Sequence, residues 1–237
     1  MNYILYKSKE RGYVDMGWLK TYHTFSFGNY YNPSAIHFGV LRVLNDDVLD
    51  PDNGFGMHPH ENMEIISIPL SGALTHKDNV GHESVIKKGE IQVMSAGAGV
   101  MHSEYNKHMS EKASLLQIWL FPNQKNVTPR YQQMSLQLLE RKNKFYQVLS
   151  PNSDDEGVWI YQDAWFYIGK FSSPMSVNHS INKQGNGLYV FMINGNSKIN
   201  GVELNNRDGI GIRDQNEFKI DITSPAEILL MELPMAV

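Results

Sequence analysis

Short runs of apolar residues recur along the whole chain, and glycine, asparagine, aspartate and proline separate one run from the next. Runs of this kind, bounded by turn-forming residues, predict β-strands. The expected strands cover residues 36–43, 64–69, 84–87, 91–94, 115–121, 158–161, 165–168, 189–193, 210–212, 218–222 and 228–233. Helical periodicity is scarce, and we interpret its best candidate, the polar stretch 131–144, as a linker with a helical turn or two. The pattern therefore predicts an all-β chain.

The expected strands fall into two sets that repeat the same order of segments. Each set has a glycine-marked turn, then a second turn that leads into a strand, then a long closing strand. The segments of the first set are LSGALT (70–75), KKGEIQV (87–93) and SLLQIWLFP (114–122), and those of the second are INGNSKI (193–199), NRDGIGI (206–212) and EILLMELP (227–234). An ordered repeat of this kind indicates one structural unit written twice. We therefore predict two packed antiparallel β-barrels, residues 1–130 and residues 131–237.

Four residues carry the candidate chemistry, in two pairs with the same spacing. His58 and His60 are two residues apart, and so are His102 and Glu104. Residues at i and i+2 of a strand point to the same face of the sheet. Two such pairs on converging strands can therefore supply four ligands to one ion.

Three imidazole nitrogens and one carboxylate oxygen suit a six-coordinate metal with positions left for water, O2 or a chelating substrate. A lone H-x-H or H-x-E is frequent by chance. The combination is more specific, because a strand and two glycine-marked turns of one predicted barrel lie between the pairs. Glu64 shares strand parity with His60, so spacing alone leaves Glu64 and Glu104 both open as the carboxylate ligand.

Composition narrows the class of protein. A chain of 237 residues is long enough to bury a substantial core. Because cysteine is absent, disulfides, thiolate chemistry and zinc ribbons are excluded. The formal charge of −4 argues against a generic nucleic-acid binder. No stretch approaches the roughly 18 apolar residues of a membrane helix, and the N-terminal segment lacks the apolar core of a signal peptide. We therefore expect a cytoplasmic protein with no membrane partner and no direct nucleic-acid partner.

The remaining histidines have simpler interpretations. We expect turn or loop positions for His76, His82 and His108, and hydrogen-bonded structural roles for His23 and His37. His179 follows them alone in the second half, with no other histidine nearby. We therefore expect the C-terminal barrel to hold no metal and to serve packing and closure of the pocket.

Several segments resemble the pirin family of the cupin superfamily. His58-Pro59-His60-x3-Glu64 is similar to the first cupin motif, and Gly89-x5-Ser95-Ala96-Gly97-x4-His102-Ser103-Glu104 is similar to the second in its pirin-like variant. Further similar segments are 17–19, 23–27, 41–45, His76-x5-His82 and 116–119. The resemblance is strong over residues 10–125 and looser from there to the C-terminus. It implies a bicupin fold of two jelly-roll barrels.

The resemblance also implies a site and an activity. In pirin-like proteins the carboxylate ligand stands at the position of Glu104, and the position of Glu64 is not a ligand. The implied ligands are therefore His58, His60, His102 and Glu104. The implied cofactor is one Fe(II) ion, with Mn, Ni, Cu, Co and Zn as alternatives. Pirin-like proteins are associated with quercetin 2,3-dioxygenase activity, in which a flavonol chelates the metal, a carboxylate takes its hydroxyl proton and O2 attacks the ring with release of carbon monoxide.

In that scheme Glu104 is both metal ligand and general base. Quercetin then stands for a flavonol-like small aromatic substrate whose physiological identity is open. The resemblance implies an alternative of another class: an iron-dependent redox-sensing module that acts on a transcription or metabolic protein partner. The chain has no evident basic run that would support the alternative. The complete ligand set argues against a third hypothesis, a vestigial site.

Overall fold

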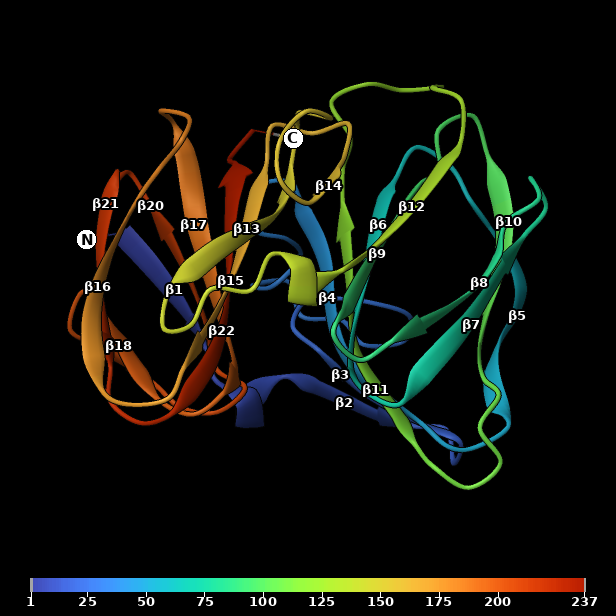
Figure 1. Cartoon of the computed structure of the whole chain (residues 1–237), viewed down its shortest axis with the longest axis horizontal. Coiled ribbons are helices and arrows are strands. Elements are labelled where there is room, and N and C mark those ends of the chain that lie inside the picture. Colours follow the sequence, from blue (N-terminus) through green and yellow to red (C-terminus); the bar gives the residue numbers. More distant parts are fainter. Residues whose placement is uncertain (1, 237) are drawn as a thin grey trace.

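The computed structural model describes residues 2–236, and β-strands make up most of this range. The strands form four sheets, two in each half of the molecule (Figure 1). In the N-terminal half the seven-stranded sheet has the order β12 (Arg130–Ser135), β9 (Glu90–Ser95), β6 (Glu64–Ser71), β11 (Ala113–Leu120), β4 (Leu41–Leu49), β3 (Leu19–His23) and β2 (Gly12–Asp15). The four-stranded sheet has the order β5 (Asn53–His60), β10 (Val100–Asn106), β7 (Ala73–Asp78) and β8 (Glu83–Lys87).

The C-terminal half repeats this arrangement. Its seven-stranded sheet has the order β1 (Asn2–Tyr6), β20 (Gly209–Arg213), β17 (Asn186–Asn194), β22 (Ala226–Pro234), β15 (Trp165–Phe171), β13 (Phe145–Ser150) and β14 (Val158–Trp159). Its four-stranded sheet has the order β16 (Met175–Ser180), β21 (Glu217–Ile222), β18 (Ser197–Ile199) and β19 (Val202–Leu204). The all-β prediction and the repeat of one unit are therefore confirmed.

Helical structure is minor. Within residues 2–236 it is limited to the 3-10 turns η1 (Ser8–Glu10) and η2 (Leu136–Leu138), and no helix there is long and apolar enough to cross a membrane. The predicted linker at 131–144 is wrong in its first half, because residues 131–135 belong to β12 and pair with β9. Its single helical turn is η2.

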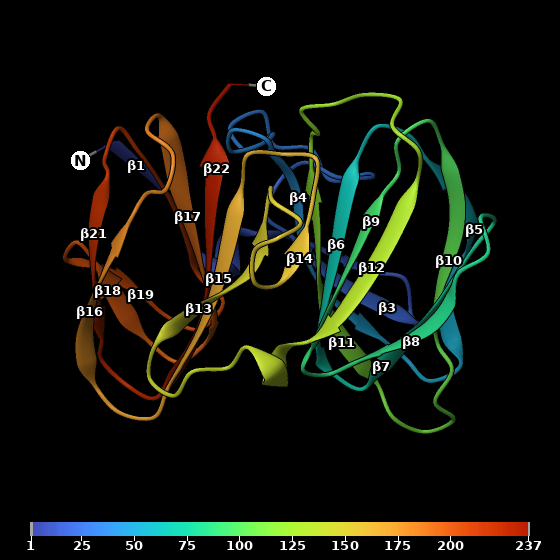
Figure 2. The same cartoon turned by 45° about the horizontal axis from the view of Figure 1, so that its top comes forward.

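The first strand of the chain belongs to a sheet of the C-terminal half. β1 lies among the strands of the C-terminal half and pairs antiparallel with β20, from Asn2 opposite Arg213 to Tyr6 opposite Gly209 (Figure 2). β12 closes the N-terminal sheet beside β9. The division of the chain at residue 130 stays a prediction, and β1 and β12 each join the sheet on the far side of it.

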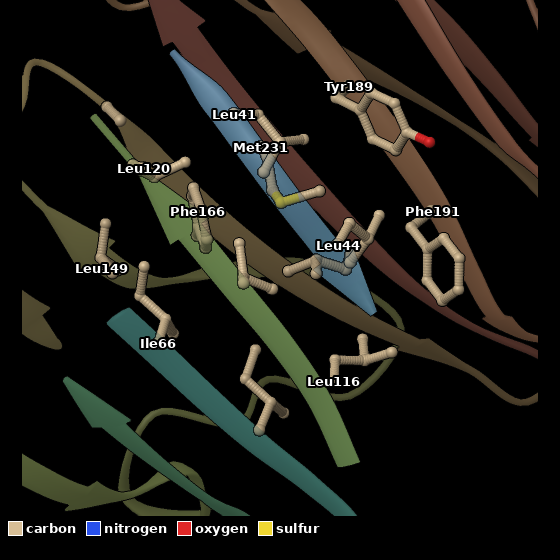
Figure 3. Packing of buried hydrophobic residues seen from close by; sticks show 14 of the residues in the cluster. Leu41, Leu44, Ile66, Leu116, Leu120, Leu149, Phe166, Tyr189, Phe191 and Met231 are labelled. Carbon is tan, nitrogen blue, oxygen red and sulfur yellow. The ribbon is translucent and has the colours of Figure 1, made fainter. Parts of the chain in front are cut away.

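One large apolar core lies between the two seven-stranded sheets. Figure 3 shows side chains of both halves meeting there: Leu41, Leu44, Ile66, Leu116 and Leu120 from the N-terminal half, and Leu149, Phe166, Tyr189, Phe191 and Met231 from the C-terminal half. Burial of this apolar surface is the main force that holds the halves together.

The opposite face of the N-terminal sheet carries both kinds of residue: Leu49 and Leu115 belong to a smaller apolar cluster, and polar residues line a cavity. Successive residues of a strand point to opposite faces, so the neighbours of the core residues on β11 and β4 face away from the C-terminal half. On β11, Leu116 and Ile118 belong to the core between the halves, whereas Gln117 lies between them in sequence and lines a cavity on the other side. Asn45 of β4 pairs with Gln117 and lines the same cavity. This far face of the sheet, with Asn45 and Gln117 on it, forms one wall of the candidate site.

Candidate metal centre

Strands β5 and β10 bring the predicted histidines together. They pair antiparallel, with His58 opposite His102 and His60 opposite Val100, and the register shifts between His102 and Glu104. Gly54 allows this close pairing: a Cβ atom there would lie 2.2 Å from the Glu104 carbonyl oxygen. Any other residue at position 54 would force the two strands apart.

His58, His60 and His102 form a compact triad. Their candidate ligand atoms all lie within 4.8 Å of one another. The ring centroids are 4.4 Å apart for His58 and His102, 4.8 Å for His58 and His60, and 4.9 Å for His60 and His102. Three imidazoles converging from two paired strands are the arrangement that the i, i+2 spacing predicted.

The triad presents unprotonated nitrogens to one point. The Nδ1–H of His58 donates a hydrogen bond of 2.7 Å to the Gly56 carbonyl oxygen, so Nε2 is the nitrogen left for a metal. The Nε2 atoms of His60 and His102 are buried and have no hydrogen-bond partner within residues 2–236. Burial and the neighbouring histidines lower the pKa of His60 to about 4 and that of His102 to about 2. Buried, neutral and unpartnered imidazoles fit a transition-metal cation.

Glu104 lies beside the triad but is not a member of the compact group. Its carboxylate oxygens are 3.2 Å from the Ser67 hydroxyl and 2.8 Å from the Gln117 Nε2, both of which donate to it. Burial raises the pKa of Glu104 to about 7. The residue is thus poised to gain or lose a proton near neutral pH, and its role as fourth ligand stays a prediction.

Glu64, the other candidate carboxylate, points elsewhere. It accepts a hydrogen bond of 2.7 Å from the Ser95 hydroxyl, and it is outside the compact group of histidines. Burial raises its pKa to about 7, although hydrogen bonds from Ser95 and the Tyr161 backbone oppose the shift. Equal strand parity with His60 therefore does not bring Glu64 to the triad.

Replacing Glu64 with glutamine tests this buried carboxyl. The folded protein holds a proton on Glu64 up to about pH 7, whereas the unfolded chain releases it near the ordinary pKa of 4.5. The free energy of unfolding must therefore fall as pH rises through this window, by about 1–3 kcal/mol. We expect the stability of Glu64→Gln relative to wild type to increase by that amount between pH 5 and pH 8, measured by urea unfolding of metal-free protein. A difference that does not change with pH would contradict the assignment.

A cavity of about 430 Å³ opens beside the triad. This volume lies in the range of small-molecule sites. Its polar lining comes from Asn45, Asp47, His58, Glu104 and Gln117, and its aromatic lining from Trp18, Phe27, Phe55 and Trp119. The described lining residues all lie in the N-terminal half, so the expected closure of this pocket by the C-terminal barrel is wrong. Packing against the other face of the sheet places that barrel away from the cavity.

Several of these residues were missed by the sequence reasoning. Asp47 lines the cavity, and burial raises its pKa to about 7. The expected strand ended at residue 43, whereas β4 runs on to Leu49, so the sequence reasoning placed neither Asn45 nor Asp47 on a strand. Trp18, Phe27 and Trp119 stood in segments quoted for the family resemblance, but no local pattern connected them to one wall.

The other histidines divide between confirmed and wrong predictions. His23 is buried and its Nδ1 lies 2.8 Å from the Asn45 side-chain oxygen, as expected of a structural histidine. His82 is half-buried in the turn before β8, and His108 lies in an exposed loop. His37 is exposed rather than in the core, but its Nδ1 lies 2.8 Å from the Gly39 carbonyl oxygen, so the expected hydrogen-bonded role is confirmed. His76 is the largest departure: it is fully buried, and its Nδ1 is 3.4 Å from the Nδ1 of His102.

Comparison with known proteins covers both halves. The family model described as Pirin matches residues 6–120, and the one described as quercetinase C-terminal cupin domain matches residues 147–233. Quercetin 2,3-dioxygenase of Escherichia coli (strain K12) is 40% identical over 230 residues, which are 97% of this chain and 98% of the relative. A pirin-like protein of Caulobacter vibrioides is 38% identical over 222 residues, 93% and 95% of the two chains.

Solved structures agree with this result. Bacterial pirin YhhW of Escherichia coli in complex with nickel(II) has a TM-score of 0.93 to this chain at 38% identity, and the match covers 100% of both chains. A second structure of YhhW gives a TM-score of 0.94 at the same identity, covering 100% of this chain and 99% of the other. The bicupin fold expected from the sequence is thereby confirmed.

Proposed function

The chain belongs to the pirin family, and on that premise we propose that it is a metal-dependent dioxygenase that opens the ring of flavonols such as quercetin. The observation that carries the proposal is the shared cavity: the buried carboxylate of Glu104, the edge of the histidine triad at His58 and four aromatic walls line one space. The relative from Escherichia coli named quercetin 2,3-dioxygenase supports the choice of reaction.

The aromatic walls suit a flat substrate. Trp18 packs edge-on against Phe55 at 5.3 Å between ring centroids, and Phe27 packs edge-on against Trp119 at the same distance. These interlocked rings hold an apolar slot in shape before a ligand arrives. Asn45, Asp47 and Gln117 place polar groups on the sheet that forms the remaining wall. A planar, hydroxylated aromatic ligand matches both kinds of surface.

Glu104 is the general base in this proposal. A base works best when its pKa lies near the working pH, and burial raises the pKa of Glu104 to about 7 in the metal-free protein. Its oxygens already contact Ser67 and Gln117, which hold the carboxylate in place as it takes the hydroxyl proton of the substrate. Ser67 can donate its own hydroxyl hydrogen to the Gln117 side-chain oxygen, 2.9 Å away, and then accept a hydrogen bond from protonated Glu104.

The histidine triad would hold the metal, with Glu104 as proposed fourth ligand. When bound, the metal supplies a Lewis acid that lowers the pKa of a chelating hydroxyl and a meeting point for substrate and O2. We propose Fe(II), and the nickel(II) complex of the relative YhhW supports nickel as the alternative. The surrounding protein buries His102 and Glu104 almost completely and leaves His58 and His60 half-buried.

Oxygen uptake tests the proposal. Protein loaded with Fe(II) under anaerobic conditions is mixed with quercetin and O2, and His58→Ala treated in the same way is the blank. We expect uptake that matches quercetin loss in the wild type and none above background in the blank. Wild-type protein with bound iron and no uptake would refute the dioxygenase reaction for this substrate, while its metal content would still report on the triad.

A further inference from the structure

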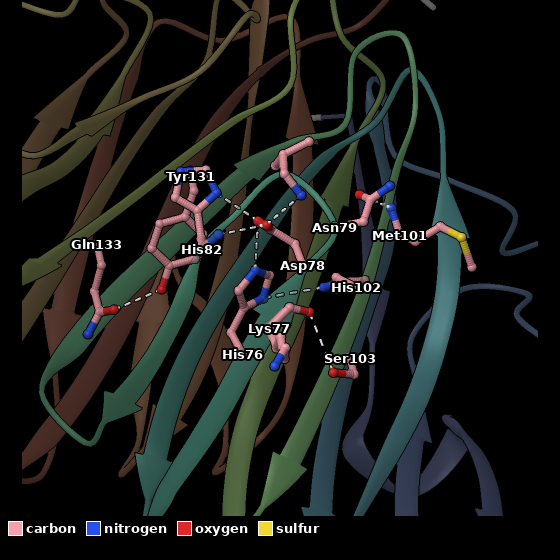
Figure 4. Close-up of polar contacts among 11 residues, drawn as sticks. His76, Lys77, Asp78, Asn79, His82, Met101, His102, Ser103, Tyr131 and Gln133 are labelled. Atoms are coloured by element: carbon pink, nitrogen blue, oxygen red, sulfur yellow. Dashed lines mark hydrogen bonds and ion pairs between the residues drawn. The ribbon is translucent and has the colours of Figure 1, made fainter.

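A chain of polar side chains runs behind the triad, outside the substrate cavity. His102 contacts His76 on β7, His76 contacts Asp78 on the same strand, and Asp78 contacts His82 in the following turn (Figure 4). The distances are 3.4 Å between the two Nδ1 atoms, 3.3 Å from His76 Nε2 to Asp78 Oδ2, and 2.8 Å from His82 Nδ1 to the same oxygen. The strand register explains the alignment, because His102 lies opposite Asp78 and Glu104 opposite His76.

Asp78 is fixed as an acceptor. Its Oδ1 accepts the backbone N–H groups of Val80 and His82, at 3.0 and 2.9 Å, and its Oδ2 faces the two imidazoles. Although burial raises the pKa of Asp78, these hydrogen bonds outweigh it and hold the pKa below its ordinary value. An ionised carboxylate has no proton to give. The Nε2 of His76 must therefore carry the proton that lies between His76 and Asp78.

The direction of the next hydrogen bond follows. A neutral imidazole has one N–H and one lone pair. With its proton on Nε2, His76 offers the Nδ1 lone pair to His102, so the Nδ1 of His102 must donate. The Nε2 of His102 is then left with a lone pair, and it is this nitrogen that is buried and unpartnered among the described residues.

The pair is also held against rotation. Tyr131 of β12 lies over both outer imidazoles, with ring centroids 4.8 Å from His76 and 5.1 Å from His82. The side chain of His76 has no exposed surface. The His76 ring therefore has no room to turn and exchange its two nitrogens, whereas the half-buried His82 is held by its contact to Asp78.

From this geometry we propose that Asp78 and His76 are positioning residues that lock His102 in the tautomer able to bind a metal through Nε2. The proposal rests on the metal centre of the proposed function and not on the dioxygenase reaction. Carboxylates that orient histidine ligands through their second nitrogen commonly change metal affinity by about 10- to 100-fold when they are removed. Here a second histidine stands between the carboxylate and the ligand.

Asp78→Asn is the sharpest variant. Backbone N–H groups can only donate, so the asparagine carbonyl oxygen must take the place of Oδ1 and accept from Val80 and His82. The asparagine NH2 group then faces His76 and donates to its Nε2. His76 must move its proton to Nδ1, and His102 must move its own to Nε2, which blocks the metal position. We expect nickel(II) affinity, measured by calorimetry, to fall by about 10- to 100-fold.

Two substitutions of His76 form a matched pair, one that keeps its hydrogen bonds and one that removes them. The side chain introduced by His76→Gln offers a carbonyl to His102 and an amide to Asp78, so this variant should retain nickel affinity. His76→Leu fills similar space without either group and should lose affinity as Asp78→Asn does. His82→Ala is the control, because it removes a contact to Asp78 without changing which nitrogen of His76 carries the proton. Unchanged affinity in both Asp78→Asn and His76→Leu would overturn the proposal.

The tautomer is observable without any metal. In metal-free protein labelled with ¹⁵N-histidine, two-bond ¹H–¹⁵N spectra distinguish a protonated from an unprotonated ring nitrogen. We expect His102 with its proton on Nδ1 in the wild type and on Nε2 in Asp78→Asn. A wild-type His102 with its proton on Nε2 would refute the proposal, even if Asp78→Asn fails to fold. Wild-type protein that binds no nickel would refute the metal centre itself, whatever O2 uptake shows.

Discussion

Replacing Glu104 with glutamine is expected to lower kcat for quercetin by about 10²- to 10⁴-fold while metal remains bound to the three histidines. Glutamine cannot accept the hydroxyl proton of the substrate, so the step assigned to Glu104 loses its base. The pocket should otherwise persist. The amide oxygen can accept from Gln117 and the amide nitrogen can donate to Ser67, which replaces both contacts of the carboxylate.

The matched control for this variant is Glu64→Gln. Glu64 is also buried and has a similarly raised pKa of about 7, but it contacts Ser95 and lies outside the cavity. Turnover should survive in Glu64→Gln, and metal content measured after purification should match wild type in both variants. Wild-type kcat in Glu104→Gln, or equal losses in the two variants, would contradict a role for Glu104 as base.

Removing the imidazole of His102 is expected to abolish metal binding. This ring is the common neighbour of His58, His60 and His76, and its side chain is almost completely buried. In His102→Ala, two histidines remain on β5 and the contribution of β10 to the triad is lost. We expect no retained metal after loading with Fe(II) or nickel(II) and dialysis, measured by elemental analysis.

His108→Ala is the control for this loss. His108 lies in an exposed loop, and its ring nitrogen accepts backbone N–H groups of Ser110 and Glu111. Its removal deletes one histidine without touching the triad, so metal content should equal that of wild type. Full metal content in His102→Ala would show that the ion binds elsewhere.

The sequence was most informative on the strands, where alternate side chains point to the same face of the sheet. Two residues of separation on a strand place His58 with His60 and His102 with Glu104, and the structure brings the three histidines together. The same rule could not decide between Glu64 and Glu104 as the carboxylate ligand. A register shift in the β5–β10 pair and the different sheet of β6 separate the two carboxylates, and neither can be read from spacing.

His76 shows why the rest of the site was hidden. Its local sequence, next to Lys77, Asp78 and a glycine-containing turn, is typical of an exposed turn. Its burial depends on β10 pairing along one side of β7 and on Tyr131 of β12 covering the ring. Both contacts come from residues distant in the chain, and a single sequence contains no signal for such pairings. The aromatic walls of the cavity were missed for the same reason.

The place of β1 has a consequence for the order of events during synthesis. Asn2 pairs with Arg213, which is made 211 residues later, so a ribosome that adds about 5–20 residues per second needs about 10–40 s to supply the partner strand. During that time the strands that carry the triad are complete, whereas the apolar face of their sheet waits for the C-terminal half. We expect the nascent chain to acquire its metal-binding half first and to be most prone to aggregation in this interval.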